Sequence, residues 1–517
     1  MKKTNNFLFT LSFLIAGYLP LNAQEKNAIT LQPENAKVTI SKDIYGHFAE
    51  HLGRCVYEGI WVGENSSIPN TKGYRNDVVA ALKDLSIPVL RWPGGCFADT
   101  YHWKDGIGPR DKRASIVNVN WGRTTEDNSF GTHEFLNLCE ILGCDAYISG
   151  NVGSGTVQEM AEWAEYMTSD AESPMTKLRK QNGREKPWKV KYFGIGNEAW
   201  GCGGNMTPEH YSDMCKQYGT YINYAGRGVN KVASGASDFN YNWTDVVMKN
   251  AGSHIQGIGV HYYTLPGDWD KKGSSTEFTE KEWFTVMKKT SMMDSLVKTH
   301  LKVMDKYDKA KRVGLIVDEW GTWYDVEPGT NPGFLYQQNT MRDALVAAIN
   351  LNIFNNHADR IKMTNIAQVI NVLQSMILTD KEKMVLTPSY YVFRMYKVHQ
   401  NATLIPVSVI SRNYTLDKES IPAISVSASK DANGKIHVTL ANLDPNAENP
   451  VTLDLGSIKA GNVTSEVLTS KAMNDYNDFG KAAKIIPAKF DKIKISGSTL
   501  QVIMPSKSVV SVEISTK

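Results

Sequence analysis

Two glutamates follow apolar segments that otherwise carry few charges. Glu198 closes the segment YFGIGNE, and Glu319 follows the segment GLIVD. An ionised carboxylate is rarely taken out of water without a purpose, because its desolvation costs several kcal/mol unless it is paired. Two carboxyl groups that flank one bond can hydrolyse a glycoside, with one group as proton donor and the other as nucleophile or base. This pair of glutamates therefore predicts glycosidase chemistry.

Eight short apolar segments could bring the two glutamates to one place. Longer polar or amphipathic stretches that can form helices separate them. Continuous hydrophobicity, without alternation, is typical of parallel strands that are buried on both faces. The candidate strands are Ile44–Phe48, Pro88–Trp92, Asp145–Asn151, Val190–Glu198, Val229–Asp238, Ile255–Tyr263, Arg312–Trp320 and Arg360–Val369.

Polar residues gather at the carboxyl ends of these segments, in the runs SGN, GNE, HYY, DEW and NIAQ. In a (β/α)8 TIM barrel, the carboxyl ends of the strands form the catalytic rim. Glu198 and Glu319 would then come from the fourth and seventh strands, and closure of the barrel can bring them together. A single glutamate at a strand end could instead form a salt bridge or cap a loop, but two on one rim weaken that explanation.

The sequence pattern changes after the barrel region, which we place at residues 44–386. Alternating Val, Ile and Thr segments bounded by Gly, Asn and Asp predict an antiparallel β-sandwich at residues 387–517. Residues 24–43 share this pattern and are expected to add a strand to the sandwich. Helices are expected at 208–225, with Thr207 as N-cap, and at 339–350. Residues 267–282 are expected to form a loop over the barrel mouth.

Length and charge agree with a two-domain enzyme and exclude some partners. The chain has 517 residues, enough for a barrel and a smaller domain. Its 57 basic and 54 acidic residues give a formal net charge of +3 without long runs of one sign, which argues against a nucleic-acid partner. No segment after the N-terminus is long and apolar enough to suggest stable membrane insertion.

The N-terminus resembles a cleaved signal peptide over residues 1–23. Lys2 and Lys3 precede an apolar stretch from Phe7 to Leu21, and small residues end at Ala23. An uncleaved membrane anchor is the alternative, but Pro20 interrupts the stretch, which is short for a span of about 20 residues. We therefore expect an exported protein, periplasmic or extracellular after cleavage.

Six cysteines are too few for a disulfide-dense scaffold, so a folded core must supply the stability. Cys139 and Cys144 have no second Cys or His pair at zinc-site spacing, so no metal is expected. The run GCGG at residues 201–204 is not followed by the GK[ST] of a phosphate loop. No cofactor is expected either.

Several segments resemble the α-L-arabinofuranosidases of glycoside hydrolase family 51. They are YGHFAEHLGR at 45–54, RWPGG at 91–95, GNE at 196–198, DEW at 318–320 and NIAQVINVL at 365–373. A lone GNE or DEW would be weak, whereas all of them in order are specific. The family retains anomeric configuration, its GNE glutamate is the acid/base and its DEW glutamate is the nucleophile. The resemblance thus implies that Glu198 is the acid/base, Glu319 is the nucleophile, and the two carboxyl groups lie about 5 to 5.5 Å apart.

The resemblance also implies further residues that bind the sugar or orient the nucleophile: Glu50, Asn197, His261, Tyr263 and Gln368. Trp121 and Trp323 resemble the aromatic walls of the family's sugar site. Each assignment has an alternative. His261 and Tyr263 could be core residues, Glu50 could pair with Arg54 or Arg91, and either tryptophan could belong to the core.

Cys96 is a departure from the family pattern. Many members have Asn after PGG, which can bind sugar hydroxyls, and a thiol is a weaker partner. Cys202 lies four residues after Glu198 and is expected near the same rim. A disulfide between Cys96 and Cys202 could therefore form in an oxidising compartment.

The resemblance implies an exo-acting enzyme. It would release terminal non-reducing α-L-arabinofuranosyl residues from arabinan, arabinoxylan or their oligosaccharides, which are plant cell-wall substrates. Two alternatives remain. One is the same mechanism on a β-xyloside or a β-glucan, and the other is a non-catalytic carbohydrate-binding barrel. Members of the family often form homo-oligomers, so the resemblance allows one here.

Overall fold

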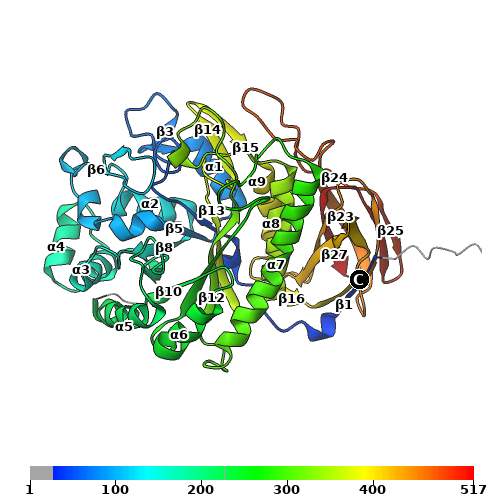
Figure 1. Ribbon diagram of the computed structural model, residues 1–517, viewed down its shortest axis with the longest axis horizontal. Helices are drawn as coiled ribbons and strands as arrows, with labels where there is room; N and C mark the ends of the chain where they lie inside the picture. Colours follow the sequence, from blue (N-terminus) through cyan, green and yellow to red (C-terminus); the bar gives the residue numbers. More distant parts are fainter. Residues whose placement is uncertain (1–26, 226–227, 517) are drawn as a thin grey trace, which may run out of the picture.

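A computed structural model describes residues 27–225 and 228–516 of the chain. The expected signal peptide, residues 1–23, lies outside the described residues. Figure 1 shows a barrel surrounded by helices beside a β-sheet unit that holds the C-terminal strands.

Eight parallel strands close into a barrel in the order β10-β11-β12-β13-β2-β5-β8-β9. Each predicted apolar segment supplies one of them, so the expected (β/α)8 barrel is confirmed. The strands are β2 Gly46–Phe48, β5 Val89–Trp92, β8 Asp145–Gly150, β9 Val190–Ile195, β10 Asn230–Ser237, β11 Gly257–Thr264, β12 Gly314–Thr322 and β13 Ile361–Ala367.

Helices cover the outside of the barrel, and most of them connect its strands (Figure 1). They are α1 Asn76–Leu85, α2 Thr132–Leu142, α3 Val157–Thr168, α4 Pro174–Gln181, α5 Pro208–Ala225, α6 Tyr241–Ala251, α7 Glu280–Met304, α8 Met341–Asn356 and α9 Pro388–Tyr396. The expected start of α5 is confirmed, since the Thr207 hydroxyl accepts from the backbone N–H of His210 at 3.3 Å.

The expected loop at residues 267–282 ends earlier than predicted. Thr279 and Glu282 form a reciprocal capping box, in which each side chain accepts from the other residue's backbone N–H. This box satisfies two N–H groups that a helix start leaves free, so α7 begins at Glu280.

The barrel interior changes from apolar to polar along its axis. In the amino-terminal halves of the strands, one layer consists of Val89, Tyr147, Val232, Ile316 and Met363, all buried. Side chains from several strands fill such a layer, so the barrel is a packed core and not a pore. Polar side chains occupy the carboxyl ends of the same strands.

The C-terminal unit is a sandwich of two sheets, as expected. The first has the order β17-β1-β22-β26-β25, and the second β16-β20-β21-β27-β23-β24. The strands are β1 Asn27–Leu31, β16 Thr403–Ile405, β17 Val407–Ile410, β20 Ile424–Lys430, β21 Ile436–Asn442, β22 Asn449–Asp454, β23 Ala460–Thr469, β24 Ala488–Lys489, β25 Ile493–Ser496, β26 Thr499–Met504 and β27 Ser508–Thr516.

The first described strand, β1, belongs to the sandwich although it precedes the barrel in the chain. It pairs parallel with β22 and antiparallel with β17. Ile29 and Leu31 point into the sandwich core and are 1% exposed. In Figure 1, β1 lies beside strands of the opposite end of the sequence.

Helix α8 joins the barrel to the sandwich. Almost all of its side chains are buried, because it packs on the barrel with one side and on β20 and β21 with the other. Asn352 accepts hydrogen bonds from Ser427 and Thr439 at 2.9 and 3.0 Å and donates to Ser425 at 3.1 Å. These bonds satisfy a polar side chain that would otherwise be costly to bury.

Short two-stranded hairpins lie in the loops between the larger elements. They pair β3 Asn70–Thr71 with β4 Tyr74–Arg75, β6 Ile116–Val117 with β7 Thr125–Glu126, β14 Ile377–Asp380 with β15 Lys383–Leu386, and β18 Asn413–Leu416 with β19 Glu419–Pro422. Across the described ranges, none of the helices has the length and apolar character needed to span a membrane.

Candidate active site

Glu198 and Glu319 meet at the carboxyl ends of the barrel strands. Glu198 follows β9, and Glu319 lies on β12. Carboxylate oxygens of the two residues lie within 4.8 Å of each other. Their side chains are 19% and 8% exposed, so Glu198 is the more accessible of the pair. Two carboxyl groups this close match the separation of retaining glycosidases, whereas inverting enzymes need about 6.5 to 9.5 Å.

Two neighbours fix the Glu319 carboxylate. Arg91 donates to Oε1 at 2.9 Å, and the Tyr263 hydroxyl donates to Oε2 at 2.9 Å. With both oxygens held from different sides, the carboxylate has one orientation. A nucleophile held in one orientation can approach its target without a rotational search.

Arg91 organises the centre of the rim. It comes from β5 and also donates to the backbone carbonyl of Asp318 at 2.9 Å, to Asn197 Oδ1 at 2.6 Å and to Ser149 at 3.1 Å. These bonds link four strands or their ends through one guanidinium. The planar group suits such a task, because its donors have a fixed geometry.

His261 lies among three carboxylates rather than in an apolar core. Its Nδ1 is 2.8 Å from Glu198 Oε1 and 3.5 Å from Glu319 Oε2, and its Nε2 is 3.3 Å from Asp318 Oδ1. An imidazolium with a proton on each nitrogen satisfies this arrangement. His261 thus touches both members of the glutamate pair.

Nearby charges and burial shift the pKa values of these residues in opposite directions. Burial alone would lower the pKa of His261, but Glu319, Asp318 and Glu198 hold that pKa well above its usual value. Burial raises the pKa of Glu319, and the cations of His261 and Arg91 partly offset this rise. Glu319 is therefore kept ionisable in a buried site by two fixed positive charges.

Glu50 forms the second polar centre of the rim. One oxygen accepts from the Gly95 backbone N–H at 2.9 Å and from Trp121 Nε1 at 3.0 Å, and the other accepts from Gln368 Nε2 at 2.5 Å. Burial and the nearby Glu319 raise the pKa of Glu50 to about 7.

The alternative partners for Glu50 are not used. Arg54 donates to the Thr379 backbone carbonyl and lies near Glu58, and Arg91 binds Glu319. Glu50 thus keeps one free lone pair, on the oxygen that accepts from Gln368, because each carboxylate oxygen has two lone pairs.

The loop that carries Glu198 is held by Asp99. The Asp99 carboxylate accepts from the backbone N–H groups of Val152, Gly153 and Asn197 at 2.8, 2.8 and 2.9 Å. Glu198 itself has φ of 39°, in the left-handed region that non-glycine residues seldom adopt. Strained backbone of this kind persists only where the surroundings impose it.

The glycines after Glu198 have a packing role. A Cβ on Gly203 would lie 1.9 Å from the Asn197 carbonyl oxygen, so only glycine fits there. Gly203 also donates to the Glu198 carbonyl at 3.1 Å. Gly203 therefore lets the loop fold tightly against the backbone of Asn197 and Glu198.

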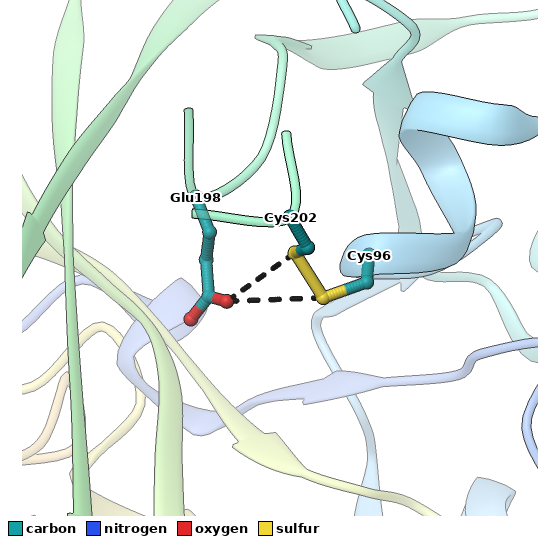
Figure 2. Close-up of side chains that lie close together, drawn as sticks. All are labelled: Cys96, Glu198 and Cys202. Atoms are coloured by element: carbon teal, nitrogen blue, oxygen red, sulfur yellow. Dashed lines mark hydrogen bonds between the residues drawn. A yellow bond between two sulfur atoms is a disulfide. The ribbon is translucent and has the colours of Figure 1, made fainter. Parts of the chain in front are cut away.

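A disulfide joins Cys96 to Cys202 beside Glu198 (Figure 2). Their sulfurs lie 3.9 and 3.5 Å from Glu198 Oε2. A disulfide sulfur has no proton, so these are packing contacts and not donated hydrogen bonds. For the same reason Cys96, expected to bind sugar, offers no thiol donor in this state.

Aromatic side chains extend outward from Glu319. Trp323 packs edge-on against Tyr263 at 5.0 Å between ring centroids, and Trp269 packs against Trp323 at 5.4 Å. Trp269 is 52% exposed and lies on the loop after β11. Trp121 joins the same group of residues through its bond to Glu50.

All the expected site residues lie on this rim, and three further residues complete it. Arg91 and Asp318 could have been recognised as charged residues inside apolar strands, because such charges must be paired. Asp99 gave no such signal, since its partners are backbone groups of two distant loops. Two sets of side chains in the described ranges could share a metal ion, one of Cys96, Glu198 and Cys202, the other of Glu198, His261 and Glu319.

Comparison with known proteins follows the two structural units. Residues 81–275 match the family model described as the α-L-arabinofuranosidase 1 domain, and residues 318–508 match that of the α-L-arabinofuranosidase C-terminal domain. Together these matches cover most of the chain.

Relatives match the chain over nearly its whole length. An intracellular exo-α-L-arabinofuranosidase of Bacteroides ovatus is 54% identical over 98% of this chain and 99% of its own. The crystal structure of the GH51 arabinofuranosidase from Xanthomonas axonopodis pv. citri is 47% identical, with a TM-score of 0.94 over 95% of this chain and 100% of that one. The α-L-arabinofuranosidase of Thermotoga maritima, solved as an arabinose complex, is 28% identical, with a TM-score of 0.84 over 95% and 100%.

One of these names corrects the expected location. The Bacteroides ovatus relative is called intracellular, which contradicts the expectation of an exported, periplasmic or extracellular protein. That expectation was wrong. It depended only on the composition of residues 1–23, and a basic start followed by apolar residues does not itself report that a chain leaves the cell.

Proposed function

Because the chain belongs to the α-L-arabinofuranosidases of glycoside hydrolase family 51, we propose that it releases terminal non-reducing α-L-arabinofuranosyl residues by double displacement. The observation that carries this proposal is the approach of the Glu198 and Glu319 carboxylates to within 4.8 Å on one barrel rim. That separation supports retention of configuration at the anomeric carbon. Arabinan, arabinoxylan and their oligosaccharides are the proposed substrates.

In the first step, Glu319 attacks the anomeric carbon. The glycosidic C–O bond breaks, and the departing oxygen takes the proton of Glu198. Arg91 and Tyr263 hold the attacking carboxylate, which limits its motion to the line of attack. The product of this step is an arabinofuranosyl ester on Glu319, and Glu198 is left as a carboxylate.

In the second step, Glu198 acts as the base. It takes a proton from a water molecule, whose oxygen attacks the anomeric carbon and breaks the ester bond to Glu319. Two inversions restore the original configuration. His261 contacts both carboxylates, so its positive charge stabilises whichever of them is ionised at each stage.

The sugar would be oriented by the polar residues across the rim. Glu50 can accept one hydrogen bond from a furanose hydroxyl, while Asn197 and Gln368 can donate and accept. Trp121 and Trp323 offer apolar faces to the sugar and to the unit next to it. Cys96 would contribute packing rather than a hydrogen bond while the disulfide is closed.

A substrate panel tests the proposal. We expect purified enzyme to hydrolyse para-nitrophenyl α-L-arabinofuranoside, and to release arabinose as the only early product from arabinan and arabinoxylan. Para-nitrophenyl β-D-xyloside and cellulose should react far more slowly. The Glu319→Gln variant serves as a matched control, because it keeps the side-chain size and should lose essentially all turnover.

The opposite results are equally informative. Preference for the xyloside or for cellulose would assign the same mechanism to another sugar. Tight binding of arabino-oligosaccharides without turnover would indicate a carbohydrate-binding barrel. Early release of oligosaccharides instead of arabinose would exclude exo action.

A further inference from the structure

Cys96, Cys202 and Glu198 form a cluster of which the proposed reaction uses only the carboxyl group (Figure 2). Glu198 Oε2 faces both sulfurs, at 3.9 and 3.5 Å. Its other oxygen is turned toward His261 at 2.8 Å. The two bonded sulfurs and one carboxylate oxygen therefore lie together at the barrel mouth.

Once the disulfide is opened, this cluster has the spacing for a tetrahedral metal ion, on which the two sulfurs would lie about 3.8 Å apart. Zinc binds sulfur at roughly 2.3 Å and carboxylate oxygen at roughly 2.1 Å, so a sulfur and an oxygen on one tetrahedral ion lie about 3.6 Å apart. The two sulfur–oxygen distances here, 3.5 and 3.9 Å, bracket that value. The Cα atoms of the cysteines are 5.5 Å apart, so both side chains can reach one centre after the sulfurs separate.

We propose that the enzyme, once the Cys96–Cys202 disulfide is reduced, binds one Zn²⁺ ion between Cys96, Cys202 and Glu198 and is inhibited by it. Two thiolates select a borderline-soft ion such as zinc over magnesium or calcium. Water would fill the fourth position. Glu198 would then be a metal ligand and could no longer pass its proton to the leaving oxygen.

The chemistry of opening and loading the site balances. A trialkylphosphine and one water molecule convert the disulfide into two thiols and a phosphine oxide. When zinc binds, each thiol releases its proton to the solvent, and the Glu198 carboxylate binds as it is. Zinc is neither oxidised nor reduced.

The surroundings allow an ion to enter this cluster. Cys202 is exposed, and Cys96 and Glu198 are half-buried. The Asn197 side-chain amide lies 3.9 Å from the Cys202 sulfur and can stabilise a thiolate there.

In the competing set of Glu198, His261 and Glu319, the ligand atoms already make hydrogen bonds or ion pairs with one another and with their neighbours. Arg91 and Tyr263 already hold both oxygens of Glu319. Each ring nitrogen of His261 faces a carboxylate. The cysteine side of Glu198 is therefore the side open to a cation.

Metal uptake is the first test and needs no substrate. Full-length enzyme is treated with trialkylphosphine, checked for newly reactive thiols, freed of reagent and dialysed against Zn²⁺. We expect one additional zinc per chain relative to the untreated, disulfide-bonded enzyme. Cd²⁺ in place of Zn²⁺ should give the ultraviolet charge-transfer band of a cadmium thiolate. Cys202→Ser should lose both signals, whereas the control Cys144→Ser, with a half-buried cysteine elsewhere, should keep them.

Inhibition is the second test and rests on the proposed function. Zinc should lower kcat/KM of the reduced enzyme on an arabinofuranoside with a poor leaving group by about 10²-fold, in the range that general acid catalysis supplies, because only such a substrate needs the proton of Glu198. A chelator should restore activity, and the disulfide-bonded enzyme should be unaffected. Each variant is compared with its own zinc-free rate, so a change in basal activity does not matter.

Several results would overturn the inference. One is zinc uptake that is equal before and after reduction. Another is reduced enzyme that takes up zinc but shows no cadmium-thiolate band when cadmium replaces zinc. A third is Cys202→Ser protein that binds as much zinc as the unmodified chain. A disulfide that stays closed in the folded enzyme under phosphine would also do so, because the site could not form. Enzyme without arabinofuranosidase activity that still binds zinc would refute the proposed function alone.

Discussion

His261 places a positive charge between the two carboxylates that carry the proposed reaction. Its Nδ1 is 2.8 Å from Glu198 and 3.5 Å from Glu319. The free enzyme can react only when its nucleophile is ionised. The acidic limb of kcat/KM plotted against pH therefore reports the ionisation of the nucleophile. Interactions that favour ionised Glu319 extend activity to lower pH.

His261→Gln should therefore move the acidic limb to higher pH. The cation of His261 counteracts the rise that burial imposes on the pKa of Glu319, so its removal raises that pKa further. The carboxylate still faces Arg91, Tyr263, Asp318 and Glu198. The apparent pKa of the acidic limb therefore belongs to this coupled group and not to Glu319 alone. The measurement is kcat/KM against pH. His102→Gln, at an exposed histidine, is the control, and a limb that stays or moves to lower pH would contradict this role.

Gly95 approaches Glu319 so closely that a single methyl group should disturb the nucleophile. A Cβ at this position would lie 2.7 Å from Glu319 Oε1. We expect Gly95→Ala to lower kcat/KM by about 10²-fold, since misplacement of a reacting group by about 1 Å can cost that much. Gly252→Ala, where the nearest atom would be 3.5 Å away, is the matched control. Equal rates for both variants would refute the steric argument.

At the scale of elements, a strand outside the barrel contributes to the sandwich core. Strand β1 lies between β17 and β22, and Ile29 is buried within that sheet. The parallel pairing of β1 with β22 joins segments more than 400 residues apart. Such a contact stabilises the fold without touching the rim.

Ile29→Ala should lower stability and spare catalysis. Truncation of a buried isoleucine typically costs about 2 to 5 kcal/mol, because transfer energy is lost and a cavity remains. The urea midpoint should fall, while kcat/KM on the aryl arabinofuranoside stays unchanged. Thr30→Ala changes an exposed position of the same strand and should leave the midpoint nearly in place. A large loss of activity in Ile29→Ala would show that the sandwich acts on the site.

Elements differed in how far their sequences could predict them. The barrel strands were readable because burial on both faces makes each one continuously apolar. Residues such as Gln368 and Tyr263 could be placed on the rim because they end those strands. The clamp of Asp99 on the Glu198 loop could not be predicted, since it bonds to backbone N–H groups whose positions depend on the finished fold. The start of α7 was missed because its capping box lies inside a polar, Gly-containing stretch.

On the scale of the whole molecule, barrel and sandwich share a polar contact that is buried in their interface. Asn352 of α8 bonds to Ser425, Ser427 and Thr439 of the sandwich. Trp283 of α7 donates to the Leu443 carbonyl at 3.0 Å. These contacts predict that the two units unfold together rather than in sequence.

Asn352→Ala should lower the melting temperature of the entire protein. Loss of its side chain removes three hydrogen bonds from the interface, and each contributes about 1 kcal/mol to stability. Differential scanning calorimetry should show one transition in both proteins, shifted down in the variant. Asn356→Ala, which removes one bond to the Val426 carbonyl, should shift it less. Two transitions, of which only one moves, would contradict coupled unfolding.

The identity of the nucleophile is the claim on which the proposed reaction depends. In the Glu198→Ala variant, an aryl arabinofuranoside with a good leaving group can still react with Glu319, but the base for the second step is missing. Mass spectrometry of the digested protein should then find one pentosyl unit on the peptide that contains Glu319, and none in the Glu198→Ala, Glu319→Gln double variant. Accumulation of the pentosyl group on another residue, or rapid turnover with no adduct, would contradict the assignment of Glu198 and Glu319.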